Sequence, residues 1–291
     1  MNLETAIASV RGAPLDPVAH LALGDAYAAA GRPVPALACW RTARSLAAAA
    51  PDSRVAAAAG ERLAGVDGTA LLAAPALRDH NRFYRLRVLA AALREAAGRD
   101  DFSVVDIGGG DGALALHLPH TEYILVEPGT NGLSGENLPF PPGSADVVAA
   151  CHVLEHVPPG DRDRFLDSLR RIARREVVLL GPFRVPGTLY RRRLQMVLDL
   201  TGAPWAREHL DCGLPDLQEL EEYAARRGVS CRHAPVGAMP TALLATLVSH
   251  YAHLAGRAGE LARLHDYLNA IAPDRHVNER LPGAYLVRLS P

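Results

Sequence analysis

The stretch "VVDIGGGDGALALHL", residues 104–118, decides the fold class of this 291-residue chain. A β-branched apolar run reaches Ile107, a glycine-rich run follows over Gly108–Gly112, and a helix-like apolar run comes after it. A glycine turn between a strand and a helix lets the backbone approach a nucleotide-like ligand at the carboxyl end of the strand. We therefore predict a first strand over 102–107 and a ligand beside the turn.

The segments that follow predict a parallel sheet. Short, β-branched apolar runs predict strands at 122–128, 145–151, 176–183, 229–237 and 284–291. Helical apolar patterns lie between them at 162–175 and 214–228. Strands that alternate with helices are typical of an α/β fold with a doubly wound, mostly parallel sheet, and the final strand is expected to close it in the antiparallel direction.

Residues 1–75 are predicted to form a small helical region in front of the main domain, 76–291. Two Ala-rich helices over 20–52 are separated by Gly31, Pro33 and Pro35. The segment resembles one tetratricopeptide repeat, with matches at Leu23, Gly24, Tyr27, Ala36, Trp40 and Ala43 and a late proline at Pro51. Such a repeat implies a protein partner. An Ala-rich hairpin packed on the main domain is the alternative, because a stable array needs about three repeats.

Composition and charge exclude several functional classes. A net charge of −1 argues against broad binding to nucleic acid or to an anionic membrane. Charged residues and glycines interrupt the apolar runs well before the roughly 18 residues of a membrane span. Residues 1–16 lack the basic and apolar regions of a secretion signal, and the four cysteines share no metal-ligand spacing. A soluble, cytoplasmic protein is expected.

The glycine turn alone is compatible with two cofactor classes. Gly108, Gly110 and Ala113 satisfy a relaxed dinucleotide fingerprint. Residues 106–112 also read D-x-G-x-G-x-G, and Glu127 ends the next strand 21 residues after the aspartate of that motif.

Two further motifs favour one class. With "ENLPF" at 136–140 and "VLEHV" at 153–157, the pattern resembles the class I S-adenosylmethionine-dependent methyltransferases over about 102–183. The resemblance implies a Rossmann-like sheet, S-adenosylmethionine as cofactor, and ribose hydroxyls bound by Glu127. It assigns the cofactor-binding residues Asp106, Gly108, Gly110, Glu127, Ser134, Gly135 and Glu136.

The sequence departs from that family in two ways. Asp146 follows Glu127 by only 19 residues, which is too few for a full helix and strand, so one crossover must be short. The family often has Asp-Ala before "ENLPF", whereas Ser134 and Gly135 stand here. Adenine is then expected to contact backbone groups near Gly135 and Glu136 or the Ser134 hydroxyl.

Histidines after the strand at 145–151 are candidate bases for methyl transfer. His152 and His156 follow this strand, and His209 in "REHL" is expected over the pocket. His152, Glu155 and His156 also spell the inverted zinc-protease motif, but the prolines at 158 and 159 cut a helix short. No metal site is assigned. Metal-assisted methylation stays an alternative, because the run resembles the Glu-x-x-Glu-His run of some small-RNA 2′-O-methyltransferases.

Two insertions are expected in the main domain. A substrate lid is predicted over about 182–215, with substrate contacts from Arg184, Arg191 and Trp205, and a helical insertion over about 241–271. Recognition of a carboxylate or phosphate is one interpretation of the lid arginines, and a solvated helix face is the other.

The sequence therefore predicts an S-adenosylmethionine-dependent methyltransferase. The first hypothesis is O-methylation of a small or saccharide-like acceptor. The arginines of the predicted lid suit an acceptor that is anionic. Methylation of a peptide or RNA end is the second. A cofactor-binding interaction module without turnover is the third.

Overall fold

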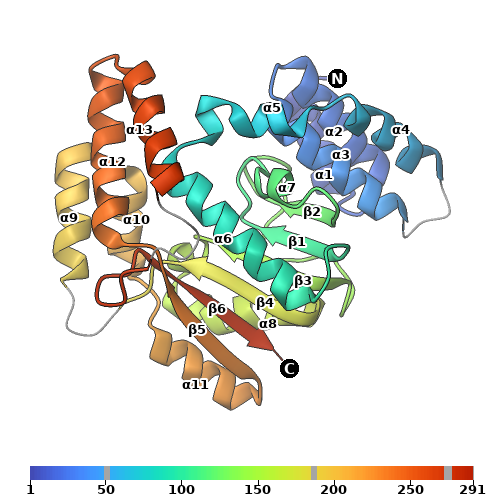
Figure 1. Ribbon diagram of the computed structural model, residues 1–291. Coiled ribbons are helices and arrows are strands. Elements are labelled where there is room, and N and C mark those ends of the chain that lie inside the picture. Colours follow the sequence, from blue (N-terminus) through green and yellow to red (C-terminus); the bar gives the residue numbers. More distant parts are fainter. Residues whose placement is uncertain (49–52, 185–188, 272–276, 291) are drawn as a thin grey trace. The chain divides into compact units, whose positions relative to one another are not determined.

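The computed structural model describes residues 1–48, 53–184, 189–271 and 277–290, and it contains a six-stranded mixed sheet flanked by helices (Figure 1). The strands lie in the order β2-β1-β3-β4-β6-β5. Their bounds are Ser103–Ile107 for β1, Glu122–Val126 for β2, Ala145–Cys151 for β3, Ala173–Gly181 for β4, Ser230–Val236 for β5 and Ala284–Ser290 for β6. The predicted α/β class is confirmed.

Strand β1 lies between two parallel neighbours. It pairs with β2, Ile107 opposite Val126, and with β3, Ile107 opposite Ala150. Residues 104–107 are buried, as expected for a parallel strand covered on both faces. The carboxyl ends of β1 and β2 therefore meet at one edge of the sheet, which brings Glu127 next to the glycine turn. Strands β5 and β6 pair antiparallel, as predicted.

Helices make up much of the remaining described chain. The α-helices are α1 Leu3–Gly12, α2 Pro17–Ala29, α3 Pro33–Ala48, α4 Ser53–Ala64, α5 Gly68–Ala73, α6 His80–Ala97, α7 Leu114–His117, α8 Arg162–Ile172, α9 Tyr190–Thr201, α10 Pro204–Cys212, α11 Leu217–Arg227, α12 Met239–Leu254 and α13 Ala258–Ile271. Three 3₁₀ turns lie at Pro75–Leu77, Leu154–His156 and Pro159–Asp161. Within the described residues, no helix is both long and apolar enough to cross a membrane.

Two predicted helices differ from the observed ones. The helix predicted over 162–175 ends at Ile172, because the next residues enter β4, where Arg174 bonds to the Gly143 carbonyl and to Asp146. The insertion predicted over 241–271 is two helices, separated by Gly256 with a left-handed φ of 66°. The short crossover is confirmed, because the described chain has no helix between β2 and β3.

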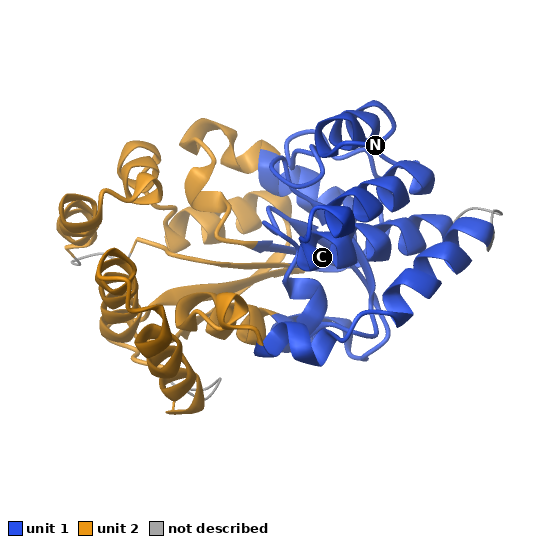
Figure 2. Cartoon of the chain, turned by 90° about the horizontal axis from the view of Figure 1, so that it is seen from above, with its two compact units in different colours: residues 1–73, 90–150, 165–177 blue, residues 74–89, 151–164, 178–291 orange. Residues whose placement is uncertain are grey.

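Contacts divide the chain into two compact units, coloured in Figure 2. Unit 1 contains residues 1–73, 90–150 and 165–177, and unit 2 contains residues 74–89, 151–164 and 178–291. The N-terminal helices end close to the predicted boundary at residue 75. They share a unit with the glycine turn.

In unit 1, the N-terminal helices pack on the sheet through α3, which contacts β2. Thr42 on α3 accepts a hydrogen bond from the Leu125 backbone, and Arg41 donates to the carbonyls of Ala115 and Thr121. Helix α3 therefore satisfies backbone groups of the edge strand and its loops. Helices α2 and α3 confirm the two predicted helices, and their resemblance to a tetratricopeptide repeat stays a prediction.

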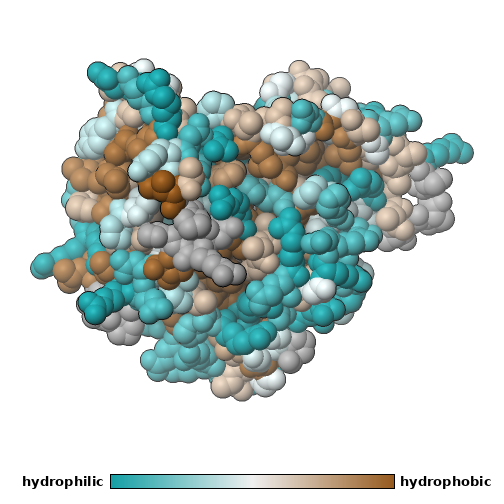
Figure 3. Space-filling view, in the orientation of Figure 1, coloured by the Kyte–Doolittle hydropathy of each residue, from teal (hydrophilic) through white to brown (hydrophobic). Residues whose placement is uncertain are grey.

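In unit 2, α9 and α10 form a helical pair with a small core of its own, made by Val197, Leu198, Ala206 and Leu210. This pair occupies most of the predicted lid; residues 185–188 of that range lie outside the described chain. Helices α9 and α12 also expose large apolar or aromatic side chains: Met196, Leu200, Leu244, Tyr251 and Leu254. The face drawn in Figure 3 shows brown, hydrophobic surface among teal, hydrophilic side chains.

Candidate active site

The glycine turn after β1 has the backbone that the sequence predicts. Gly108, Gly110 and Gly112 have left-handed φ angles of 67°, 60° and 83°, which favour glycine. A Cβ at Gly109 would lie 2.3 Å from an Asp106 carboxylate oxygen, whereas one at Gly110 would meet no atom within 4 Å. Gly110 therefore borders open space, as a backbone that approaches a ligand must.

Glu127 holds the turn from the end of β2. Its Oε2 accepts a hydrogen bond from the Gly110 amide at 3.0 Å, and its Oε1 accepts one from Gly129 at 3.1 Å. The Glu127 amide donates to Asn131 Oδ1 at 3.0 Å. Each carboxylate oxygen keeps a further lone pair, which is what the predicted contact with two ribose hydroxyls requires.

Asp106 lies below the turn, in the core of unit 1. Its side chain is 1% exposed and accepts a hydrogen bond from the Tyr123 hydroxyl at 2.6 Å. Burial raises the pKa of Asp106 to about 7, although the hydrogen bond from Tyr123 opposes the shift. The carboxyl group supports the turn against Gly109, and its predicted role beside the cofactor stays a prediction.

Asp106→Asn is expected to remove a pH dependence of stability. Between about pH 4, the pKa of an unfolded aspartate, and about pH 7, the folded chain binds a proton that the unfolded chain has released. The free energy of unfolding therefore falls as pH rises, by about 1.4 kcal/mol for each unit in that window. Asparagine still accepts from Tyr123 but does not titrate. Urea unfolding of both proteins at several pH values tests this, and parallel pH profiles would contradict it.

The residues predicted to contact adenine lie in unit 1 as well. A Cβ at Gly135 would come within 2.8 Å of Ile107 and 2.9 Å of Phe165, so packing alone requires glycine there. The Ser134 hydroxyl accepts from the Glu136 amide at 3.3 Å. Their contact with adenine stays a prediction.

Unit 2 contains a cavity of about 600 Å³, a size that suits a small molecule. The wall is formed by the start of α6, the segment after β3, the helices α9, α10 and α12, and the segments before α12 and before β6. Apolar side chains dominate the wall, and the polar ones gather in separate groups. The three histidines predicted as bases, His152, His156 and His209, all line this cavity.

His152 occupies a strained position directly after β3. Its φ is 57°, the one left-handed value among the described residues other than glycine, and its amide donates to the Leu180 carbonyl at 2.7 Å. Its Nδ1 lies 2.9 Å from Glu155 Oε1. Its Nε2 is buried without a hydrogen-bond partner in the described chain. Burial and the charge of Arg85 lower the pKa of His152.

His156 and His209 face each other from the 3₁₀ turn at 154–156 and from α10. Their Nε2 atoms are 3.3 Å apart, and His156 Nδ1 lies 2.8 Å from Glu208 Oε2. The Trp205 ring stands edge-on to His209 at 5.4 Å and lines the cavity, and its predicted contact with substrate stays a prediction. Burial lowers the pKa of His209 to about 4.

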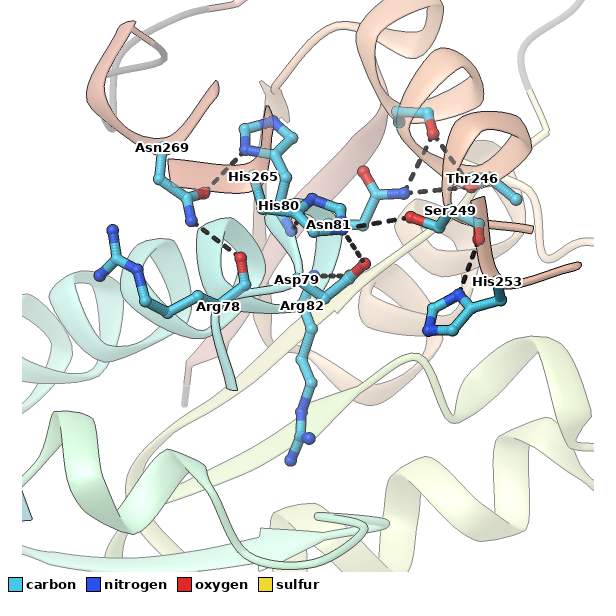
Figure 4. A network of polar contacts seen from close by, with 11 residues as sticks. Arg78, Asp79, His80, Asn81, Arg82, Thr246, Ser249, His253, His265 and Asn269 are labelled. Carbon is cyan, nitrogen blue, oxygen red and sulfur yellow. Dashed lines mark hydrogen bonds and ion pairs between the residues drawn. The ribbon is translucent and has the colours of Figure 1, made fainter. Parts of the chain in front are cut away.

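A second polar group, which no sequence motif signalled, joins the start of α6 to α12 and α13 (Figure 4). The His80 amide donates to His265 Nδ1 at 3.1 Å, and the His80 ring contacts Asn269 Oδ1 at 2.8 Å. Asn81 donates to Thr246 Oγ1 at 3.1 Å. His80, Asn81 and Thr246 line the cavity. Only the three-dimensional packing of distant helices brings these side chains together.

Positive charge predominates among the described cavity-lining residues. Arg85, Arg193 and Arg280 carry guanidinium groups, and Asp79 carries the carboxylate. Asp79 already lies 3.3 Å from His265 Nε2.

Two predicted substrate-binding residues have other partners. Arg184 pairs with Asp216 at 2.5 Å, and Arg191 donates to the Leu210 carbonyl at 3.3 Å. Their predicted contact with substrate stays a prediction, whereas the lid arginine on the cavity wall is Arg193.

Comparison with known proteins gives one family match. A family model described as a methyltransferase domain matches residues 78–234, more than half of the chain. Among solved structures, YcgJ from Bacillus subtilis is 15% identical, with 70% of this chain and 97% of that chain covered and a TM-score of 0.43. The plantazolicin methyltransferase BpumL, in complex with S-adenosylhomocysteine, is 11% identical, with 88% and 96% covered and a TM-score of 0.45. No curated protein matches the sequence.

Proposed function

Because the chain belongs to the methyltransferase-domain family and is an enzyme that uses S-adenosylmethionine, we propose that it methylates an oxygen atom of a small, anionic acceptor. The observation that carries this proposal is the cavity of unit 2, which combines a small-molecule volume with three guanidinium groups and four imidazoles. Guanidinium groups bind carboxylates and phosphates, and imidazoles bind or deprotonate a hydroxyl.

His152 is proposed as the group that accepts the acceptor's proton. Its Nδ1 faces Glu155, which places the ring proton on Nδ1 and leaves the Nε2 lone pair for the acceptor. The described part of the chain offers this buried nitrogen no hydrogen-bond partner, and an acceptor hydroxyl would supply one. Methyl transfer itself asks mainly for positioning of the oxygen in line with the sulfonium.

Turnover assays test the proposal. The enzyme is incubated with S-adenosylmethionine and panels of hydroxylated carboxylates, sugar phosphates, short peptides and short RNAs, and S-adenosylhomocysteine is measured. We expect turnover with members of the first two panels. Turnover confined to peptides or RNA would contradict the proposal in favour of the polymer-end alternative.

Arg193→Gln is expected to raise the acceptor KM about tenfold. Among the residues that the structure describes, its guanidinium donates only to the Met239 thioether, a weak acceptor, at 3.0 Å, so it is available to an anion. Loss of one charged hydrogen bond costs about 1.5 kcal/mol and acts on binding before kcat. The matched control is Arg192→Gln, an exposed neighbour on α9. Steady-state kinetics measure the acceptor KM of both variants. A KM that rises equally in both, or in neither, would contradict a contact between Arg193 and the acceptor.

A further inference from the structure

We propose that Glu155, His156 and His209 bind one divalent transition-metal ion on the wall of the cavity. One potential ligand atom from each residue lies within 4.8 Å of the other two. The imidazole Nε2 atoms are 3.3 Å apart, and Glu155 Oε1 is 3.9 Å from His209 Nε2. Ligand atoms about 2.0–2.1 Å from a tetrahedral ion stand about 3.3 Å from one another. The observed spacing therefore needs little adjustment.

The carboxylate of Glu155 is the observation that points to a cation. The residue is 1% exposed, and its Oε1 has no well-formed hydrogen bond within the described chain. His152 Nδ1 faces this oxygen as an ion-pair partner at 2.9 Å, and His209 Nε2 stands 3.9 Å away, beyond hydrogen-bond distance. A buried charge is expensive unless it is paired or coordinates a metal. An ion between Glu155 and the two imidazoles would satisfy it.

Neighbouring side chains orient the two imidazoles as metal ligands require. Glu208 Oε2 lies 2.8 Å from His156 Nδ1, which fixes the proton there and turns the Nε2 lone pair toward His209. A carboxylate behind a histidine is the usual outer contact of a metal site. The Trp205 ring packs against His209 from the side. A simple hydrogen bond between the imidazoles explains their 3.3 Å contact but leaves the Glu155 oxygen unsatisfied.

The ligand set selects the class of ion. Two imidazoles and one carboxylate suit Zn²⁺, Co²⁺ or Mn²⁺, whereas Mg²⁺ and Ca²⁺ prefer oxygen ligands throughout. Three protein ligands leave a coordination position open. His156 and His209 line the cavity, so this position is available to its occupant. If the proposed function holds, an ion there would polarise the acceptor oxygen, and this last step rests on that function.

The test titrates the chelator-treated, full-length protein with CoCl₂ alone and records visible absorption. We expect one Co²⁺ per chain, displaced by Zn²⁺. His156→Ala and His209→Ala should weaken Co²⁺ binding more than about 100-fold, and Glu208→Gln about tenfold. His120→Ala, at an exposed residue outside unit 2, is the matched control and should bind normally. The site would be overturned if Co²⁺ did not saturate the protein, or if the His156 and His209 variants bound Co²⁺ as the unmodified protein does.

Two features keep the test decisive. His209 is buried and its variant can fail to fold, but His156 is exposed, and circular dichroism with thermal unfolding shows whether each variant is folded. Metal binding needs no acceptor, so it is separable from the proposed function. Stoichiometric Co²⁺ binding without turnover on any panel supports the site and counts against the acceptor class. Turnover without Co²⁺ binding, unchanged by chelator, overturns the site and leaves the function.

Discussion

His152→Ala is expected to lower kcat by about 10² to 10⁴, the range typical for loss of a positioned proton acceptor, while S-adenosylmethionine binds with nearly unchanged affinity. The physical reason is the placement of Nε2, which is buried on the cavity wall and has no hydrogen-bond partner among the described residues, while Glu155 contacts the other ring nitrogen. Single-turnover kinetics and calorimetry with the cofactor measure the two quantities separately.

A second substitution controls for the strained backbone at this position. His152 has a φ of 57°, which alanine adopts at a cost but asparagine tolerates well. His152→Asn therefore keeps the local backbone and removes the imidazole. Both variants are expected to lose turnover. If His152→Asn retains turnover, the role of the histidine is to hold the backbone conformation, and another group accepts the proton of the acceptor.

Gly110→Val is expected to weaken S-adenosylmethionine binding about 100-fold while the chain still folds. A Cβ at Gly110 meets no atom of the described residues within 4 Å, so a branched side chain would enter the space that the ligand is predicted to occupy. Overpacking a site costs about 1–3 kcal/mol, and each 1.4 kcal/mol is a factor of ten in affinity. Calorimetry and thermal unfolding give affinity and stability for each variant.

Two glycines serve as controls for this substitution. Gly31 has a similar φ of 69° and open space around its Cβ position, so Gly31→Val carries the same backbone strain and should leave cofactor affinity unchanged. Gly109→Ala places a Cβ 2.3 Å from the Asp106 carboxylate and should destabilise the fold instead. Equal losses of affinity in Gly110→Val and Gly31→Val would remove Gly110 from the cofactor site.

The sequence by itself determined the sheet and the turn beside it. Short β-branched runs and a glycine-rich run are local patterns, and the rule that parallel strands end at one edge places Glu127 near Gly110 without knowledge of any distant contact. The 19-residue spacing between Glu127 and Asp146 predicted the short crossover after β2. The environment of the Asp106 side chain was harder to predict from the sequence, because the Tyr123 hydroxyl that donates to it comes from the neighbouring strand.

Only the tertiary structure decided the composition of the cavity wall. His209 follows His156 by 53 residues, and no spacing rule connects an α10 side chain with a 3₁₀ turn, so their contact depends on how α9 and α10 pack. The contact between His80 and His265 depends in the same way on helices far apart in the sequence. Sequence periodicity predicts which face of a helix is apolar. It does not predict which element that face packs against, because this depends on contacts between distant parts of the chain. In this cavity, those contacts determine which polar side chains lie next to one another.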